Sequence, residues 1–156
     1  MTPAVKLMTS TSIAFRLCEY DHDPANSNFG VEAADLLGLD PDQVFKTLIV
    51  LVGEEEMCAV VPVSGQLSLK LFAQAVGAKR AEMCPPNRAE RSTGYLVGGI
   101  SPIAQRRRLR TVIDETALLY DEIYVSGGRR GLDVAVDPND LAFLTDATFA
   151  DIASGQ

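Results

Sequence analysis

The chain has 156 residues with 47% hydrophobic and 22% charged side chains, which excludes a disordered chain and predicts a single domain over residues 1–156. The formal net charge of −7 is the wrong sign for a nucleic-acid partner when the chain is taken as a whole. The sequence has no Trp and only 6% aromatic residues, which argues against a surface that stacks bases on aromatic rings.

The first half of the chain predicts short helices that alternate with short strands. Pro3 after Thr2 is a usual helix start, and Ser68 precedes a second run with helical spacing. Two apolar runs, TLIVLV and MCAVVPV, flank Gly53 and three glutamates, which is the pattern of a hairpin with largely buried strands. The predicted elements are a helix over residues 3–8, a strand over 14–20, a helix over 31–39, strands over 47–52 and 57–63, and a helix over 68–76.

The second half predicts a Gly-rich loop over residues 92–102 and a second hairpin. The segment SGGRR separates two apolar runs and indicates the hairpin turn, and Asp137 before Pro138 predicts a last capped helix. The predicted elements are a short strand over 79–83, a short helix from Pro85, strands over 111–113, 122–125 and 131–136, and a helix over 138–144. Because helices and strands interleave without a regular strand–helix repeat, we expect an α+β fold in which short helices flank a mixed, curled, barrel-like sheet.

The cysteines and the N-terminal sequence favour a cytoplasmic protein. Cys18, Cys58 and Cys84 are odd in number and form no C-x-x-C pair, so neither a disulfide framework nor a structural zinc site is expected. The first residues lack a basic-then-apolar leader, and no apolar run approaches the roughly 18 residues of a membrane span. We therefore expect a reducing, cytoplasmic environment, no membrane, no metal and no cofactor.

Charge is segregated along the chain. Residues 1–69 carry three bases and ten acids, residues 70–130 carry eleven bases and six acids, and residues 131–156 carry five acids and no base. The densest basic segment, RRRLR, contains Arg106, Arg107, Arg108 and Arg110. Arginine clusters suit phosphate contacts, so the middle of the chain is a candidate RNA-facing surface. A solvated basic face on an acidic protein is the alternative.

Lys46 and two glycine pairs are the candidates for contacts with a ligand. Lys46 stands directly before a buried strand, where an ammonium group can bind phosphate or polarise a carbonyl. The alternative is an ordinary lysine at a sheet edge. Gly98–Gly99 and Gly127–Gly128 can bring backbone N–H groups close to a ligand, or can form plain turns.

The lone histidine argues against several familiar hydrolytic sites. His22 lies between Asp21 and Asp23, but no second histidine completes a catalytic zinc set, and we interpret it as a loop residue with capping neighbours. No G-x-S-x-G, P-loop or dinucleotide motif is present. If this chain catalyses a hydrolysis, the catalysis must therefore come from positioning and electrostatics.

Six segments spread over residues 1 to about 152 carry a resemblance to a known family. They are MTPAVK at the start, NFG at 28–30, QVFKTL at 43–48, GQL at 65–67, RSTGYLVGGISP at 91–102 and YVSGGRRGLD at 124–133. Together they resemble the YbaK/EbsC family of Cys-tRNA(Pro) deacylases, which is related to the editing domain inserted in bacterial prolyl-tRNA synthetases. The 91–102 block is the most specific of the six.

The resemblance implies the family's fold and a free-standing trans-editing hydrolase. Prolyl-tRNA synthetase mischarges tRNA(Pro) with cysteine because a pocket discriminates poorly between side chains of similar size. In the family, activity depends on the lysine that matches Lys46. The implied substrate-binding residues are Tyr20, Asn28, Phe29, Thr47, Gly98, Gly99, Ile100, Ser101, Pro102, Ser126, Gly127 and Asp133. Residues 98–102 match the family's G-x-x-x-P loop, which is thought to hold the terminal adenosine through backbone groups.

The family's chemistry is attack by the substrate's own cysteine thiol on the ester carbonyl. We therefore expect Lys46 to anchor a phosphate or the carbonyl, since an ammonium beside phosphate stays charged and is unsuited to proton abstraction. The implied partners are the acceptor end of tRNA(Pro), contacted by Arg106, Arg107, Arg108 and Arg110, and prolyl-tRNA synthetase in a ternary complex. A non-catalytic module that binds tRNA or the synthetase, and an editor of Ala-tRNA(Pro), are the alternatives.

Overall fold

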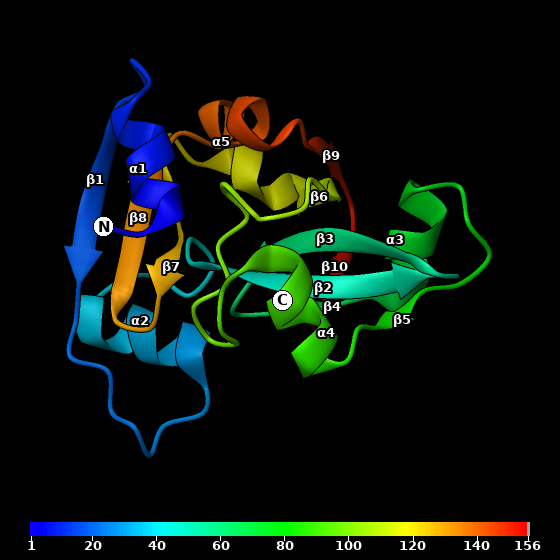
Figure 1. Cartoon of the computed structure of the whole chain (residues 1–156), viewed down its shortest axis with the longest axis horizontal. Coiled ribbons are helices and arrows are strands. Elements are labelled where there is room, and N and C mark those ends of the chain that lie inside the picture. Colours follow the sequence, from blue (N-terminus) through cyan, green and yellow to red (C-terminus); the bar gives the residue numbers. More distant parts are fainter. Residues whose placement is uncertain (156) are drawn as a thin grey trace.

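The computed structural model describes residues 1–155 (Figure 1). In chain order its elements are α1 (Pro3–Thr9), β1 (Phe15–Glu19), α2 (Phe29–Leu37), β2 (Phe45–Val52), β3 (Glu55–Pro62), β4 (Gln66–Leu67), α3 (Leu69–Ala75), β5 (Glu82–Met83), α4 (Pro86–Thr93), β6 (Arg110–Asp114), the 3-10 helix η1 (Glu115–Leu119), β7 (Ile123–Arg129), β8 (Leu132–Val136), α5 (Pro138–Thr145), β9 (Thr148–Ala150) and β10 (Ala153–Ser154). None of the helices within these residues has the length and apolar character needed to cross a membrane.

The strands form two larger sheets and one small pair. The five-stranded sheet has the order β5-β2-β3-β6-β9, with β3–β6 and β6–β9 parallel and the other pairs antiparallel. The antiparallel three-stranded sheet has the order β1-β8-β7 and lies on the left in Figure 1, and β4 pairs with β10. The predicted α+β fold with a mixed sheet is confirmed. The two larger sheets stay separate and do not close into a barrel. Within residues 1–155 their backbones pair only at one isolated bridge, between Val44 and Tyr124.

Local signals set the helix starts. The side chains of Thr2, Ser68 and Asp137 each accept a hydrogen bond from a backbone N–H two or three residues further along, and so cap α1, α3 and α5. Pro follows the cap at α1 and α5, where its missing N–H has no cost. All three helices begin within a residue of their predicted positions.

Two boundaries near the site differ from those predicted. α2 begins at Phe29 and ends where Gly38 adopts a left-handed φ of 67°. β2 begins at Phe45, because its antiparallel pairing with β3 continues to that residue. Lys46 and Thr47 are therefore strand residues with fixed backbone directions.

The apolar residues of β2 alternate between two cores. Ile49 and Leu51 belong to the main core, which also contains α1, β8 and the fully buried Ile113. Val50 faces the opposite core, where Phe72 of α3 covers the other side of the five-stranded sheet. This alternation holds β2 firmly in register, since a slip by one residue would exchange the two faces.

Candidate functional site

A cavity of about 320 Å³ opens beside α2, at the start of β2. Its volume falls within the usual range for small-molecule sites. Nine of the predicted site residues line it: Tyr20, Asn28, Phe29, Lys46, Thr47, Gly98, Ile100, Ser126 and Asp133. Residues far apart in the sequence are thus brought to one place by the first turn of α2, the start of β2, the 97–100 loop and the β7–β8 pair.

Lys46 is the cation that lines this cavity. Its side chain is partly buried, and its Nζ donates a hydrogen bond to the backbone carbonyl of Gly65 at 3.2 Å. Burial lowers the pKa of the Lys46 ammonium from its ordinary value. Lys46 takes part in none of the ion pairs found in residues 1–155. Because an ammonium has three N–H donors, two remain for a ligand.

Asp133 is the carboxylate that lines the cavity. It lies on β8, opposite Ser126 of β7 and Cys18 of β1, and is 6% exposed. Burial raises the pKa of the Asp133 carboxyl to about 7. Burial and the nearby charge of Asp133 also raise the pKa of Tyr20. The site therefore holds a carboxyl group that burial pushes toward its neutral form.

The hydroxyl of Thr47 is a free polar group in the cavity wall. Its Oγ1 is buried and has no hydrogen-bond partner within residues 1–155. Buried polar atoms without a partner are rare in folded proteins and are costly unless a ligand or water satisfies them. The hydroxyl of Thr47 is therefore an unsatisfied buried group next to the cavity.

The 97–99 loop and Phe29 meet at the edge of the cavity. Gly98 has a φ of 89°, and a Cβ at this position would lie 2.8 Å from the ring carbons of Phe29. The ring of Phe29 packs against His22 at 5.6 Å between centroids, and the guanidinium of Arg130 lies over it at 4.7 Å. Glycine is thus required at position 98 both by the backbone and by this close approach.

Four predicted contact residues do not line the cavity. Gly99 packs on the backbone of Arg129, and Gly127 packs under Leu132, where a Cβ at either glycine would clash at 2.7 Å. Ser101 is fully buried and accepts a hydrogen bond from the N–H of Ile103 at 3.1 Å. Pro102 faces a second, smaller depression of about 120 Å³. Within the G-x-x-x-P loop, Gly98 and Ile100 line the cavity and the other residues support it.

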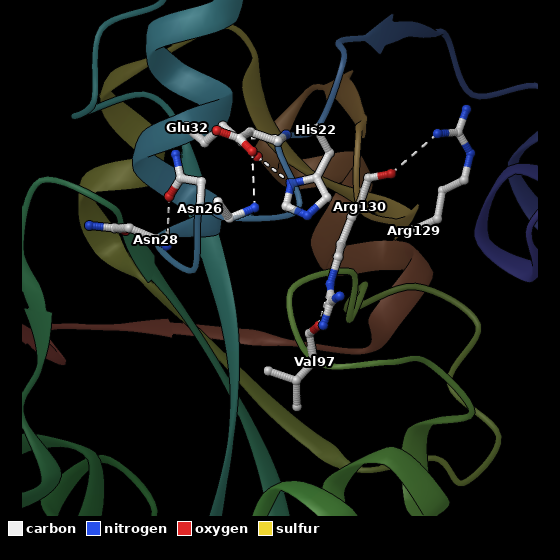
Figure 2. A network of polar contacts seen from close by, with 9 residues as sticks. His22, Asn26, Asn28, Glu32, Val97, Arg129 and Arg130 are labelled. Carbon is white, nitrogen blue, oxygen red and sulfur yellow. Dashed lines mark hydrogen bonds and ion pairs between the residues drawn. The ribbon is translucent and has the colours of Figure 1, made fainter.

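His22 is tied to the start of α2. Its Nδ1 lies 2.6 Å from Oε1 of Glu32, whose other oxygen accepts the backbone N–H of Asp23 at 2.9 Å (Figure 2). Asp23 in turn caps the backbone N–H of Ala25. The interpretation of His22 as a loop residue with capping neighbours is confirmed. Within residues 1–155 no group of three or more His, Cys, Asp or Glu side chains is placed to hold a metal ion.

The arginine segment lies away from the cavity walls. Arg107 forms an ion pair with the buried Glu56 at 3.1 Å and borders the second depression with Arg108. Arg106 is exposed beside Gly94, at the end of α4. The guanidinium of Arg110 lies 3.5 Å from the carbonyl oxygen of Val76. A role of these arginines in binding tRNA stays a prediction.

Several residues of the site gave no signal in the sequence. Met83, Cys84 and Ala89, from β5 and α4, line the cavity, but apolar residues of this kind are more often plain core. Val97 also lines the cavity, and Arg130 reaches its edge from the β7–β8 turn. For Arg130 the available signal was its place in the basic SGGRR turn, which does not tell a ligand contact from a solvated charge.

Comparisons with known proteins point to aminoacyl-tRNA editing. Residues 26–144 match the sequence profile of the family described as "Aminoacyl-tRNA editing domain". An Enterococcus faecalis protein, "Putative Cys-tRNA(Pro)/Cys-tRNA(Cys) deacylase EbsC", is 33% identical over 156 residues that cover 98% of this chain and 93% of the relative. The crystal structure of "hypothetical protein APE2540" superposes with a TM-score of 0.86 at 27% identity, covering 97% of this chain and 99% of that one. That of "a putative trans-editing enzyme for prolyl tRNA synthetase" gives 0.84 at 25% identity and covers 99% of both chains.

Proposed function

Because this chain belongs to the family of aminoacyl-tRNA editing domains, we propose that it is a trans-editing deacylase that hydrolyses the ester of mischarged Cys-tRNA(Pro). The family supplies the class of reaction, and the name of the Enterococcus relative supports the amino acid and the tRNA. The observation that carries the proposal is that one cavity holds both Lys46 and Asp133. A cysteinyl ester carries a carbonyl oxygen and an α-ammonium group, which match a cation and a carboxylate.

The substrate itself supplies the nucleophile in this proposal. The cysteine sulfur adds to the ester carbonyl carbon, and the bond from that carbon to the ribose oxygen breaks. The thiol proton ends on the departing ribose oxygen, and cysteine leaves as a four-membered thiolactone, which water then opens. The residues that line the cavity include no histidine that could serve as the base of a serine or cysteine nucleophile.

Lys46 stabilises the charge that develops on the ester oxygen. Two of its N–H donors are free after the bond to Gly65, and a partly buried ammonium acts more strongly than one in water. Burial lowers the pKa of Lys46, whereas a developing negative charge on the substrate favours the protonated form. Lys46 therefore acts as an electrostatic anchor and does not take up the thiol proton.

Asp133 binds the α-ammonium group of the aminoacyl ester. The ion pair requires an ionised carboxylate, and the pKa of about 7 places that ionisation near neutral pH. Substrate binding favours the ionised form, because an opposite charge lowers the pKa of a carboxyl group.

The proposed partners are tRNA(Pro) and prolyl-tRNA synthetase. The family is described as an aminoacyl-tRNA editing domain, and one structural neighbour as "a putative trans-editing enzyme for prolyl tRNA synthetase". A cavity of about 320 Å³ has room for little beyond the aminoacyl end. We therefore propose that selection of the tRNA comes from the synthetase in a ternary complex.

Release of cysteine from Cys-tRNA(Pro), measured with and without prolyl-tRNA synthetase, tests the proposed function. We expect release by this protein alone and faster release when the synthetase is present. No release under either condition would refute the deacylase. Binding of tRNA without release would instead identify the non-catalytic binding module.

Ala-tRNA(Pro) tests the role of the thiol in the same assay. An alanyl ester has no sulfur to attack the carbonyl, so its release should be at least about a hundredfold slower, in line with the loss of an intramolecular nucleophile. Equal rates on the two substrates would rule out thiol assistance and assign the chain to the alanine editors.

A further inference from the structure

Arg130, in the turn between β7 and β8, contacts two residues that line the cavity, Phe29 and Val97, and so lies at the mouth of the cavity. Its guanidinium carbon lies 4.7 Å from the centroid of the Phe29 ring, which lines one side. Its Nε and Nη2 both donate to the backbone oxygen of Val97, on another side, at 2.9 and 2.6 Å (Figure 2). The aromatic contact and the two hydrogen bonds together hold an exposed guanidinium in one place.

The fixed guanidinium keeps one hydrogen-bonding edge free. The two bonds to Val97 use the edge formed by Nε and Nη2. Arginine has five N–H donors, so the edge formed by Nη1 and Nη2 is left for another acceptor. This edge presents two parallel N–H groups, which is the geometry that binds a phosphate through two oxygens.

Arg130 also has no close ion-pair partner among the residues that the structure describes. None of the ion pairs found in residues 1–155 includes Arg130, whereas its neighbour Arg129 faces Glu19 at 3.8 Å. Asp133 is the carboxylate among the residues that line the cavity, and it is buried in the wall. A pre-positioned cation without a counter-ion at the mouth of a cavity is suited to an anionic part of the ligand.

We propose that Arg130 forms a phosphate subsite, which binds the phosphodiester on the 5′-oxygen of the terminal adenosine. This inference rests on the proposed function, since it places the ester within the cavity. The phosphate nearest to that ester is on the same nucleotide, one ribose away, and so falls at the mouth. The two cations then have separate tasks: Arg130 holds the phosphate and Lys46 the ester carbonyl.

Two small esters separate phosphate binding from a structural role. One is 2′(3′)-O-cysteinyl-adenosine, and the other is the same ester of adenosine 5′-monophosphate. Arg130→Ala should raise KM for the phosphorylated ester about tenfold, or about 1.4 kcal/mol, and change KM for the nucleoside ester and both kcat values by less than about twofold. Arg130→Lys should recover part of the loss, because it restores the charge without the planar fork.

Arg129→Ala is the matched control, since Arg129 is the preceding residue, is also exposed and carries the same charge. It should leave KM for both esters unchanged. If Arg130 only held Val97 and Phe29 in place, Arg130→Ala would impair both esters alike, and the subsite would be refuted. An unchanged KM for the phosphorylated ester would refute it as well.

Binding measurements distinguish a failure of the subsite from a failure of the proposed function. Calorimetric titration of the whole protein with adenosine 5′-monophosphate and with adenosine should show tighter binding of the nucleotide. This preference should disappear in Arg130→Ala and persist in Arg129→Ala. If the protein hydrolyses neither ester but keeps the Arg130-dependent preference, the subsite stands and the deacylase is refuted. Equal binding of the two ligands by the unsubstituted protein refutes the subsite, whatever the hydrolytic activity.

Discussion

Lys46 and Asp133 are opposite charges that burial pushes toward their neutral forms. Burial lowers the pKa of the lysine and raises the pKa of the aspartate to about 7. Neither side chain takes part in the ion pairs of residues 1–155. Holding such groups without partners costs folding free energy, which a ligand with complementary charges recovers on binding.

Replacement of Lys46 tests the electrostatic anchor. Lys46→Ala should lower the single-turnover rate of Cys-tRNA(Pro) deacylation by about a hundredfold or more, the usual loss when one pre-positioned donor to a developing oxyanion is removed. Lys79→Ala is the control, because Lys79 is an exposed lysine outside the cavity. An undiminished rate in Lys46→Ala would contradict the role given to this residue.

Replacement of Asp133 should separate stability from activity. The folded protein keeps a proton on Asp133 up to about pH 7, whereas the unfolded chain releases it near pH 4. The contribution of this proton to stability is therefore complete below about pH 4 and is lost as the pH rises through 7. Asp133→Asn should raise the free energy of unfolding by up to about 4 kcal/mol at pH 8 and by little at pH 4.

Urea denaturation at the two pH values measures this difference, and Asp151→Asn, at an exposed carboxylate, is the control. Asp133→Asn should also lower kcat/KM, because the ion pair to the α-ammonium group is lost. In the unsubstituted protein, kcat/KM should rise with pH through about 7 as this carboxyl ionises. Equal stability gains at pH 4 and pH 8 would contradict a raised pKa of Asp133.

At the scale of elements, the mouth of the cavity is formed by the start of α2, the 97–99 loop and the β7–β8 turn. The close contacts of these segments are made at glycines. The 97–99 loop approaches Phe29 at Gly98 and the β7–β8 turn at Gly99. The turn itself approaches the backbone of Tyr20 at Gly131, where a Cβ would lie 2.8 Å from the carbonyl oxygen. The segments are thus held together by close backbone approach, which a side chain at any of these glycines would disturb.

Gly98→Ala tests this arrangement. The new Cβ would meet the Phe29 ring at a φ of 89°, so we expect a loss of about 1–3 kcal/mol in stability and a lower kcat/KM from the displaced ring. Gly38→Ala is the control, because Gly38 has a φ of 67° but nothing within 4 Å of its Cβ position. It should cost about 1 kcal/mol and leave deacylation unchanged. Equal effects of both substitutions on activity would contradict a specific contact with Phe29.

The helices and strands that could be predicted are those whose formation depends on residues close together in the sequence. The caps at Thr2, Ser68 and Asp137 and the apolar hairpin around Gly53 are visible in the sequence, and all are found. The strands β4, β9 and β10 have two or three residues and exist only through pairing with distant segments, such as Gln66 with Ser154. No local pattern specifies such pairs, and they were not predicted.

The site residues also divide into those that the sequence indicated and those that it did not. Its polar residues could be named from the family resemblance, whereas Met83, Cys84 and Ala89 have the side chains of ordinary core residues. The resemblance also named Ser101 and Gly127, which are buried beneath the cavity edge. A motif marks a loop as a whole and does not tell the residues that face a ligand from those that support the loop.

At the scale of the whole molecule, the net charge of −7 conceals a basic middle segment. Within that segment Arg107 is already paired with Glu56, while Arg106 and Arg108 are exposed and take part in none of the ion pairs of residues 1–155. If the cluster binds tRNA, as predicted, we expect Arg106 and Arg108 to contribute more than the paired Arg107. We expect the acidic ends of the chain to oppose nonspecific RNA binding elsewhere.

Charge reversal tests this assignment. The double substitution Arg106→Glu and Arg108→Glu should weaken tRNA binding by about tenfold or more and reduce the slope of log K against log salt by about two. Fluorescence anisotropy over a series of salt concentrations measures both quantities. Asp146→Lys and Asp151→Lys, in the acidic end, form the control and should not weaken binding. An unchanged slope in the arginine variant would place the RNA contact elsewhere.

Within residues 1–155 the two larger sheets share one backbone bridge, between Val44 and Tyr124, so a ligand in the cavity between them should stabilise the whole fold. Beside this bridge, the side chain of Gln43 donates a hydrogen bond to the backbone oxygen of Glu122, and side-chain packing joins the two larger sheets. The cavity has walls from both sheets. A bound aminoacyl nucleotide would contact residues of both sheets and so hold them together while it is bound. It would raise the free energy of unfolding by RT ln(1 + [L]/Kd). A non-hydrolysable substrate analogue should therefore raise the melting temperature, which offers a route to ligands of this site that requires no catalytic turnover.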